Sequence, residues 1–220
     1  MSTIQTTPRP LVILAAFFLA VGLWQIGEGS WIYAKARLAQ VLLRRAWFRT
    51  LAGETQVRPW PWADTWPVSR LRVPSQHIDL IVLNGAYGRT LAFGPAFVES
   101  SALPGAGGTT ILTGHRDTHF AFIRQLKESD EIVIDRPDGR STGYRVHETR
   151  IVDARTDSIF LSDETKQLIL LTCYPFDAVF SGSPLRYLVR AIQPPSAPPR
   201  SIDRPAGTDW SAQGESAQPR

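Results

Sequence analysis

The sequence predicts a mostly β protein, folded as a closed or nearly closed β-barrel and preceded by an N-terminal membrane helix. Seven short runs rich in Val, Ile, Leu, Thr and Tyr lie between residues 70 and 192, separated by Gly, Pro, Asn or Asp. Helical patterns do not alternate with these runs, which argues against a doubly wound parallel sheet. A chain of 220 residues can bury one such core, so we expect one domain with appendages.

The N-terminal residues predict the membrane helix. The run from Pro10 to Ile26 is almost continuously apolar, and its 17 residues are near the short limit for crossing a bilayer as a helix. The run also fits the apolar region of a signal peptide, and Ala34-Lys35-Ala36 has the form of a cleavage site. This tripeptide lies too far beyond the run for efficient cleavage. We therefore favour an uncleaved anchor within residues 1–29.

Residues 30–67 predict an amphipathic helix and a connector. Between residues 31 and 47, apolar residues follow one helical stripe and most Lys and Arg residues lie elsewhere. Such a helix lies on the bilayer surface or packs on the domain that follows, and the sequence leaves both open. Residues 54–67 contain three prolines and three tryptophans, which predict an irregular, stiff connector. We expect its tryptophans to pack onto the domain.

Residues 68–192 predict the barrel. We expect strands near residues 71–73, 78–83, 109–113, 131–135, 143–152, 167–172 and 185–192, and a turn at Pro137-Asp138-Gly139. One stretch, near residues 119–127, has a helical pattern. Residues 193–220 are rich in proline and poor in apolar residues, so we expect this tail to be disordered.

Charge and cysteine content exclude several classes of protein. Residues 1–50 hold six Lys and Arg and one acidic residue, whereas residues 51–220 hold 18 basic and 19 acidic residues. The positive excess beside the apolar run suits contact with an anionic lipid bilayer. The barrel region has no net field that would attract DNA or RNA, so we expect no nucleic-acid partner. A single cysteine excludes an internal disulfide.

Two of the predicted strands end in residues that are used in thiol catalysis. The run Leu168-Ile169-Leu170-Leu171-Thr172 ends at Cys173, the one cysteine of the chain, and the run from Thr109 to Thr113 leads through Gly114 to His115. A cysteine after an apolar strand is by itself more often buried and inert. If both strands end at the same rim, however, the imidazole can shuttle protons for the thiol.

Arg186 is the candidate for stabilising charge in the transition state. It lies thirteen residues beyond Cys173, and a hairpin would return its strand beside the first. A guanidinium near the thiol stabilises both a thiolate and an oxyanion. Arg190 would point to the same face of the strand as Arg186 but lies further from the strand end, so it serves as a control.

Three segments resemble the sortases, the cysteine transpeptidases that attach proteins to bacterial surfaces. They are Thr113-Gly114-His115-Arg116-Asp117-Thr118, Leu171-Thr172-Cys173-Tyr174-Pro175-Phe176 and Leu185-Arg186-Tyr187. The string is most similar to the class found in Gram-negative bacteria and also resembles class D. The resemblance implies an eight-stranded β-barrel, with His115 as the acid and base, Cys173 as the thioester-forming nucleophile and Arg186 as the transition-state stabiliser. Thr172 and Phe176 are expected substrate contacts.

The resemblance also implies the partners and the location. The substrate would be a protein with a C-terminal sorting signal of the Leu-Pro-x-Thr-Gly kind, and the accepting amine is not identified by the sequence. This chemistry requires the catalytic domain to lie outside the cytoplasm. We therefore expect a single-pass protein of the bacterial inner membrane with its N-terminus inside and its barrel in the periplasm.

Other chemistries are less well supported by the residues. His115 and His119 have helical spacing for a zinc site, but Arg116 stands where a metalloprotease has Glu, and no third ligand is apparent. We expect no metal and no cofactor, and we assign Asp117 a structural place. Two alternatives remain: a peptidase that uses the same site but ends in hydrolysis, and a membrane-tethered binding barrel with an inert, buried Cys173.

Overall fold

The computed structural model describes residues 9–162, 164–178, 182–194 and 200–201, and within them all side chains except those of residues 9–11, 26–33 and 200–201. The strands are β1 (Pro67–Val73), β2 (Ile78–Asn84), β3 (Ala96–Phe97), β4 (Thr109–Thr113), β5 (Glu131–Asp135), β6 (Arg140–Asp153), β7 (Gln167–Cys173), β8 (Leu185–Ile192) and β9 (Arg200–Ser201). The helical elements are α1 (Arg9–Leu51), α2 (Gly88–Leu91) and two 3-10 helices, η1 (Pro74–Gln76) and η2 (Ala121–Gln125).

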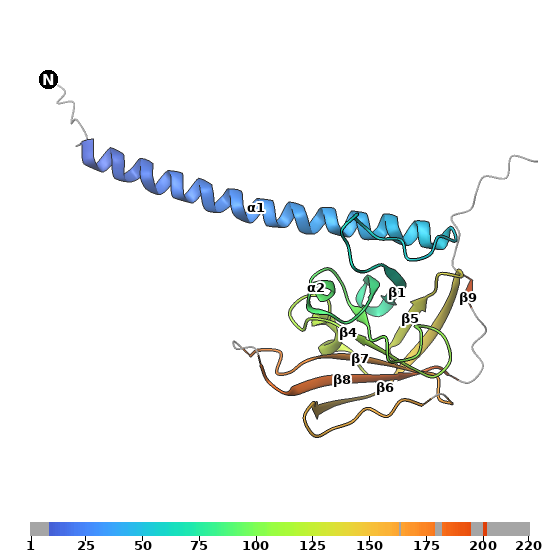
Figure 1. Ribbon diagram of the computed structural model, residues 1–220. Helices are drawn as coiled ribbons and strands as arrows, with labels where there is room; N and C mark the ends of the chain where they lie inside the picture. The colour runs from blue at the N-terminus through green and yellow to red at the C-terminus, as the bar shows by residue number, and fades with distance from the viewer. Residues whose placement is uncertain (1–8, 163, 179–181, 195–199, 202–220) are drawn as a thin grey trace, which may run out of the picture.

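Eight strands close into a barrel (Figure 1). They follow the order β5-β1-β2-β3-β4-β7-β8-β6, and β5 pairs with β6 to complete the ring. The predicted mostly β, eight-stranded closed barrel is therefore confirmed, and all seven predicted runs are strands. The sequence did not reveal β3 and β9, because two residues are too few to show a periodicity.

The predicted tail lies largely outside the described residues. Of residues 195–220, the structure describes Arg200 and Ser201, which pair with Ser141 and Arg140 at the start of β6. These two residues form the short strand β9, and the predicted disorder of residues 193–220 stays a prediction. The helical stretch expected near residues 119–127 is the short 3-10 helix η2.

The strands around the site are buried on both faces. On β7, Leu168 and Leu170 point into the barrel and belong to its main core. The alternate residue Ile169 points outward, where it packs with Leu188 in a second apolar cluster. Ile159, from the connection between β6 and β7, covers this outer cluster. Because both faces are packed, the end of β7 is held on a rigid element.

A buried carboxylate links the strands where the barrel closes. Asp135, the last residue of β5, is 1% exposed and accepts hydrogen bonds of 2.8 and 2.7 Å from Arg72 of β1. It also accepts a hydrogen bond of 2.7 Å from the Ser141 hydroxyl of β6. A buried carboxylate is costly without such partners, so these bonds favour the register in which β1, β5 and β6 meet.

The C-terminal part of α1 packs on the barrel. Its buried residues recur at helical spacing along one face: Ala39, Leu43, Ala46, Trp47 and Thr50. Leu43 and Trp47 form a cluster with Ile81 and Leu83 of β2. The Gln40 amide donates a hydrogen bond of 2.8 Å to the Phe93 carbonyl. Of the two expectations for residues 31–47, packing on the domain is the one that the structure supports.

The connector after α1 is irregular, as predicted, and its tryptophans differ. The Trp60 ring lies 4.8 Å from the Phe93 ring, which confirms its packing onto the domain. Trp62 is 82% exposed, so for this residue the expected packing is wrong.

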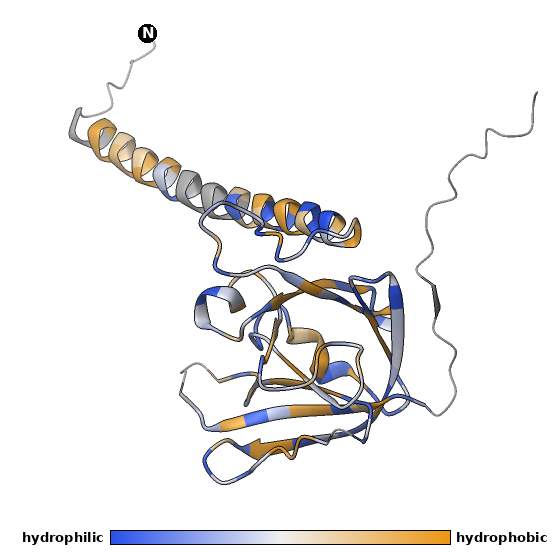
Figure 2. Ribbon diagram, turned by 45° about the vertical axis from the view of Figure 1, so that its right-hand side comes forward, coloured by the Kyte–Doolittle hydropathy of each residue, from blue (hydrophilic) through white to orange (hydrophobic). Residues whose placement is uncertain are grey.

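The first half of α1 projects beyond the barrel and is hydrophobic in Figure 2. Large apolar side chains between residues 12 and 24 are exposed. Within the described residues, however, no helix combines the length and the apolar character needed to cross a membrane. The membrane helix of residues 1–29 therefore stays a prediction.

We predict that α1 stabilises the folded domain. Trp47→Ala should lower the free energy of unfolding by about 3–5 kcal/mol, because it leaves a cavity against β2. Phe48→Ala is the matched control, since the Phe48 side chain is 67% exposed, and it should change the value by less than about 0.5 kcal/mol. Denaturant titration measures both, and equal losses would contradict the packing of α1.

Candidate active site

The pairing of three strands brings His115, Cys173 and Arg186 to one rim of the barrel. β4 and β7 are parallel, with Thr113 opposite Leu171, so the positions two residues further on, His115 and Cys173, lie at the same level. β7 and β8 are antiparallel, and Cys173 lies directly opposite Arg186. The structure thus brings together the three residues expected from the strand ends.

Cys173 is a free and exposed thiol at the end of β7. Its side chain points to the outer face of the barrel, as those of Ile169 and Leu171 do, whereas the alternate residues Leu170 and Thr172 point inward. The apolar cluster of Ile169 therefore continues along the outer face toward the thiol. The binding-barrel alternative required a buried cysteine, and the exposure of Cys173 shows that this part of it is wrong.

Gly114 and Thr172 hold the ends of β4 and β7 together, next to His115 and Cys173 in the chain. A Cβ atom on Gly114 would lie 2.8 Å from the Phe120 ring, so this close approach requires glycine. The Gly114 amide donates to the Leu171 carbonyl at 3.3 Å, and the Thr172 hydroxyl donates to the Gly114 carbonyl at 2.6 Å. Thr172 is 2% exposed, so its described contact is this strand link, not a substrate-facing one.

Arg116 forms a second link between the two strand ends, which the sequence did not reveal. Its Nη1 donates to the Pro175 carbonyl at 2.5 Å and its Nη2 to the Ala178 carbonyl at 2.6 Å. The side chain is 11% exposed, and its Nε lies 3.4 Å from an Asp117 oxygen. Arg116 therefore ties the residue after His115 to the loop after Cys173. In the sequence, the one feature that pointed to a role for Arg116 was its position next to His115.

Arg186 is oriented by its own hairpin. Its Nη1 donates hydrogen bonds to the Ser183 carbonyl at 2.6 Å and the Leu185 carbonyl at 2.8 Å. Its charge also reaches Asp153, whose pKa is lowered to about 2, chiefly by hydrogen bonds from Arg155. By contrast, Arg190 lies opposite Ile169, away from the rim, and forms an ion pair of 2.9 Å with Glu148.

Aromatic side chains flank the thiol. The Phe176 ring lies 5.1 Å from the Tyr187 ring and 6.1 Å from the Tyr174 ring. Phe176 also packs against the main core and is half-buried, which places it beside the site as expected. These rings fix the loop that follows Cys173.

The described residues around the site have the groups for acyl transfer and lack a metal cluster. An exposed thiol and a guanidinium lie on β7 and β8, and an exposed imidazole lies two residues beyond the end of the adjacent strand β4. They can act as nucleophile, proton carrier and oxyanion stabiliser. In the part of the chain that the structure describes, no group of three His, Cys, Asp or Glu residues is placed to hold a metal ion.

Comparison with known proteins identifies relatives with this architecture. Sortase D of Bacillus subtilis (strain 168) is 34% identical over 120 residues, which cover 54% of this chain and 60% of that protein. Sortase A from Corynebacterium diphtheriae has a TM-score of 0.55 and 27% identity, over 67% of this chain and 69% of that one. Sortase C-1 from Actinomyces oris has a TM-score of 0.52 and 29% identity, over 59% of this chain and 75% of that one.

The family model named Sortase domain matches residues 71–193, which extend from β1 through β8. This match covers more than half of the chain and contains all three rim residues. The chain therefore belongs to the sortase family, whose members are cysteine transpeptidases.

Proposed function

We propose that this protein cleaves a C-terminal sorting signal of the Leu-Pro-x-Thr-Gly kind and transfers the released carboxyl end to an amine. The observation that carries the proposal is the register that places His115, Cys173 and Arg186 side by side at one rim. The same geometry serves hydrolysis when water replaces the amine, so the products distinguish the two outcomes.

In the proposed mechanism, the Cys173 thiolate attacks the carbonyl carbon of the threonine in the signal. The new C–S bond forms, the Thr–Gly amide bond breaks, and His115 gives its proton to the leaving amine. Arg186 stabilises the oxyanion between these events. Its two described hydrogen bonds both start from Nη1, which leaves the donors on Nε and Nη2 for the substrate.

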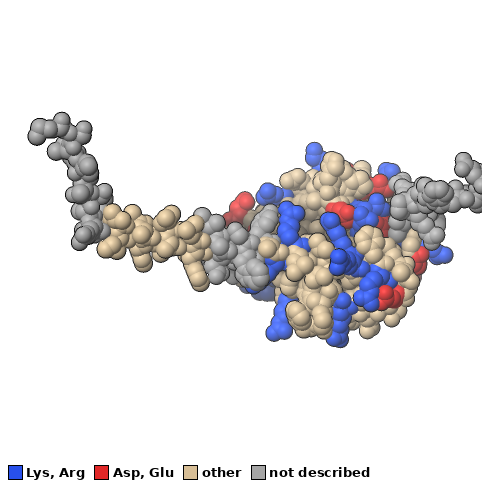
Figure 3. Space-filling model, turned by 90° about the horizontal axis from the view of Figure 1, so that it is seen from above, with Lys and Arg blue, Asp and Glu red and all other residues tan. Residues whose placement is uncertain are grey.

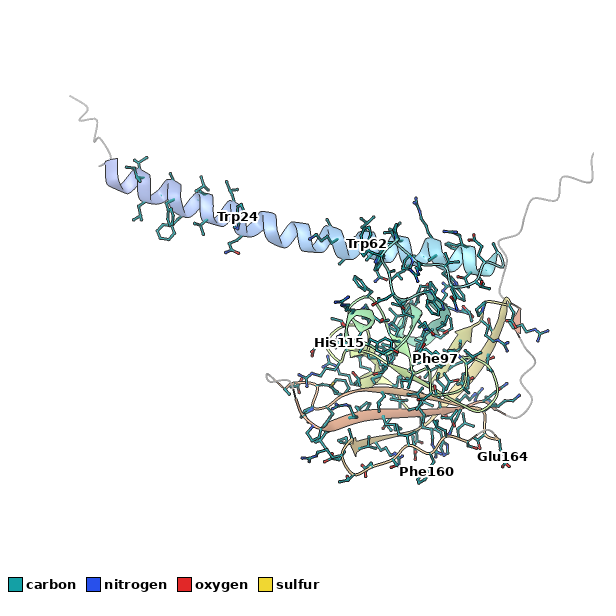
Figure 4. All side chains as sticks on the ribbon, in the orientation of Figure 1. Trp24, Trp62, Phe97, His115, Phe160 and Glu164 are labelled. Carbon is teal, nitrogen blue, oxygen red and sulfur yellow. The ribbon has the colours of Figure 1, made fainter. Side chains whose placement is uncertain are left out.

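We propose that the outer face of β7 receives the apolar part of the signal. Leu171 lies two residues from Cys173 on the same face, and it packs against the outer cluster that Ile111 and Ile169 form. Ile159 and Val98 border this cluster. A leucine side chain of the signal would be desolvated there while its threonine reaches the thiol. Phe160, which follows Ile159 in the chain, is 87% exposed, and Figure 4 shows it on the side of the barrel away from α1.

We further propose that residues 1–29 anchor the protein in the bacterial inner membrane, with residues 68–192 as the periplasmic catalytic unit. Exposed apolar residues on the first half of α1 support the anchor. The positive excess of residues 1–50 suits contact with anionic lipid, whereas residues 51–220 have no net positive charge. Figure 3 shows Lys and Arg side chains on the face of the molecule that carries α1.

The rim residues give the first prediction for activity. Cys173→Ala and His115→Ala should each abolish cleavage of a Leu-Pro-x-Thr-Gly peptide, and Arg186→Lys should lower kcat/KM at least about 100-fold, because an ammonium lacks the planar fork. Arg190→Ala should stay within about twofold of the wild type, since Arg190 lies away from the rim. Fluorogenic peptide cleavage gives the rates.

The thioester itself is the decisive observation for the mechanism. Mass spectrometry of the full-length protein with the peptide should show an acyl adduct on Cys173, and the products with and without an added amine separate transfer from hydrolysis. Cleavage of the peptide at the wild-type rate by Cys173→Ala would rule out covalent catalysis by Cys173.

Arg116 gives a second prediction, as a positioning residue. Arg116→Ala should lower kcat about 10–100-fold with little change in KM and shift the pH profile of kcat/KM, because the thiol and the imidazole lose their shared frame. Asp117→Asn is the comparison, and it should retain activity within about threefold, since Asp117 is 69% exposed and pairs with Arg116 alone among the contacts described here. An unchanged pH profile in Arg116→Ala would assign this residue to stability only.

A further inference from the structure

A short turn at the end of β6, residues 153–157, lies beside Arg186. β6 and β8 are antiparallel, and Asp153, the last residue of β6, lies opposite the residue before Arg186. Because strands lie about 4.8 Å apart and rise ~3.3 Å per residue, the Cα atoms of Asp153 and Arg186 are about 6 Å apart. The Ala154 amide donates to the Pro184 carbonyl at 2.9 Å. This bond joins the turn to the hairpin that orients Arg186.

The turn is held by its backbone groups. The Asp153 amide donates to the Asp157 Oδ2 atom at 2.7 Å, and the Asp157 amide donates to the Asp153 carbonyl at 2.8 Å. The Arg155 amide donates to the Asp153 Oδ1 atom at 2.9 Å. None of these three bonds uses the side chain of Arg155. A change of this side chain should therefore leave the turn folded.

The Arg155 side chain pairs with both oxygens of the Asp153 carboxylate. Its Nε donates to Oδ1 at 3.1 Å and its Nη2 to Oδ2 at 2.8 Å. The Asp153 side chain is 22% exposed, whereas that of Arg155 is 72% exposed. A guanidinium on the solvent side thus neutralises a carboxylate that lies against the hairpin of Arg186.

Asp153 and Arg186 interact through their charges and not through a direct bond. Hydrogen bonds from Arg155 lower the pKa of Asp153 most, and the charge of Arg186 lowers it further. Among the contacts that the structure describes, however, no hydrogen bond or ion pair joins the two side chains, and Arg186 donates instead to the Ser183 and Leu185 carbonyls.

Without its partner, the Asp153 carboxylate would compete for Arg186. A guanidinium fits a carboxylate with two parallel hydrogen bonds, and such a pair would use the donors on Nε and Nη2 of Arg186. These are the donors that the proposed mechanism reserves for the oxyanion. In the structure, Arg155 fills this place on Asp153, so the donors of Arg186 stay free of the carboxylate.

We propose that Arg155 is a positioning residue for catalysis, because it occupies the Asp153 carboxylate and so keeps Arg186 available to the substrate. The proposal rests on the transpeptidase function proposed above and deepens it, since the connection between β6 and β7 then controls the oxyanion stabiliser. Arg155 acts through Arg186 and does not itself touch the reacting atoms. Its effect therefore belongs to the acylation step, in which Arg186 bears the oxyanion charge.

Rescue by a second substitution tests the proposal on the full-length protein. Arg155→Ala should lower kcat for cleavage of a Leu-Pro-x-Thr-Gly peptide about 5–20-fold with KM within about twofold, because Asp153 then competes for Arg186. Asp153→Asn removes the competing charge and keeps the oxygen that accepts the Arg155 amide, so it should stay within about twofold of the wild type. The double variant should return to within about threefold of the wild type. Arg155→Lys should do the same, since an ammonium still neutralises the carboxylate.

Arg145→Ala is the matched control, because Arg145 is also an exposed arginine of β6 and lies opposite Ile192, away from the rim. It should stay within about twofold of the wild type. An unchanged kcat in Arg155→Ala, or a double variant as slow as Arg155→Ala, would overturn the role of Arg155. A loss in Asp153→Asn equal to that in Arg155→Ala would overturn it too, since the carboxylate would then be needed. A wild-type protein that forms no adduct on Cys173 would instead overturn the proposed function, so the two failures are distinguishable.

Discussion

The parallel pairing of β4 and β7 is the constraint on which the site depends. Parallel neighbours end at the same edge of a sheet, so a residue just beyond β4 meets the last residue of β7. The pairing of Thr113 with Leu171 then sets His115 level with Cys173. A shift of one residue would turn the thiol into the barrel core, because side chains alternate between faces. The bonds of Thr172 and Arg116 across this pair favour the one useful register.

The rest of the fold keeps this pair of strands rigid. A closed barrel leaves no free edge along which β4 or β7 could slip, and the network around Asp135 joins the strands at the closure. The outer cluster with Ile169 buries the second face of β7, and α1 packs on β2 through Trp47. Cys173 and Arg186 thus lie on packed strands, and His115 follows the end of a third packed strand.

The sequence predicted what depends on local pattern. Short runs rich in Val, Ile, Leu, Thr and Tyr located seven strands, and the ends of two of these runs identified Cys173 and His115. The short distance to the next strand identified Arg186. Beyond the meeting of His115 and Cys173, the sequence did not predict how the segments around these two residues contact each other. The bond from Arg116 to the Pro175 carbonyl joins positions separated by 59 residues, and the inward side chain of Thr172 follows from the barrel, not from its neighbours in the chain. β3 was missed because two residues have no pattern to read.

His115 has two roles in the proposed mechanism, and together they constrain the order of events. His115 lies two residues beyond Thr113, level with Cys173. In that mechanism it gives a proton to the leaving amine and later takes one from the incoming amine. Both amines would therefore occupy the same place beside the imidazole when the proton moves. On this mechanism the glycine end of the signal leaves before an acceptor enters, so the two transfers form a double displacement.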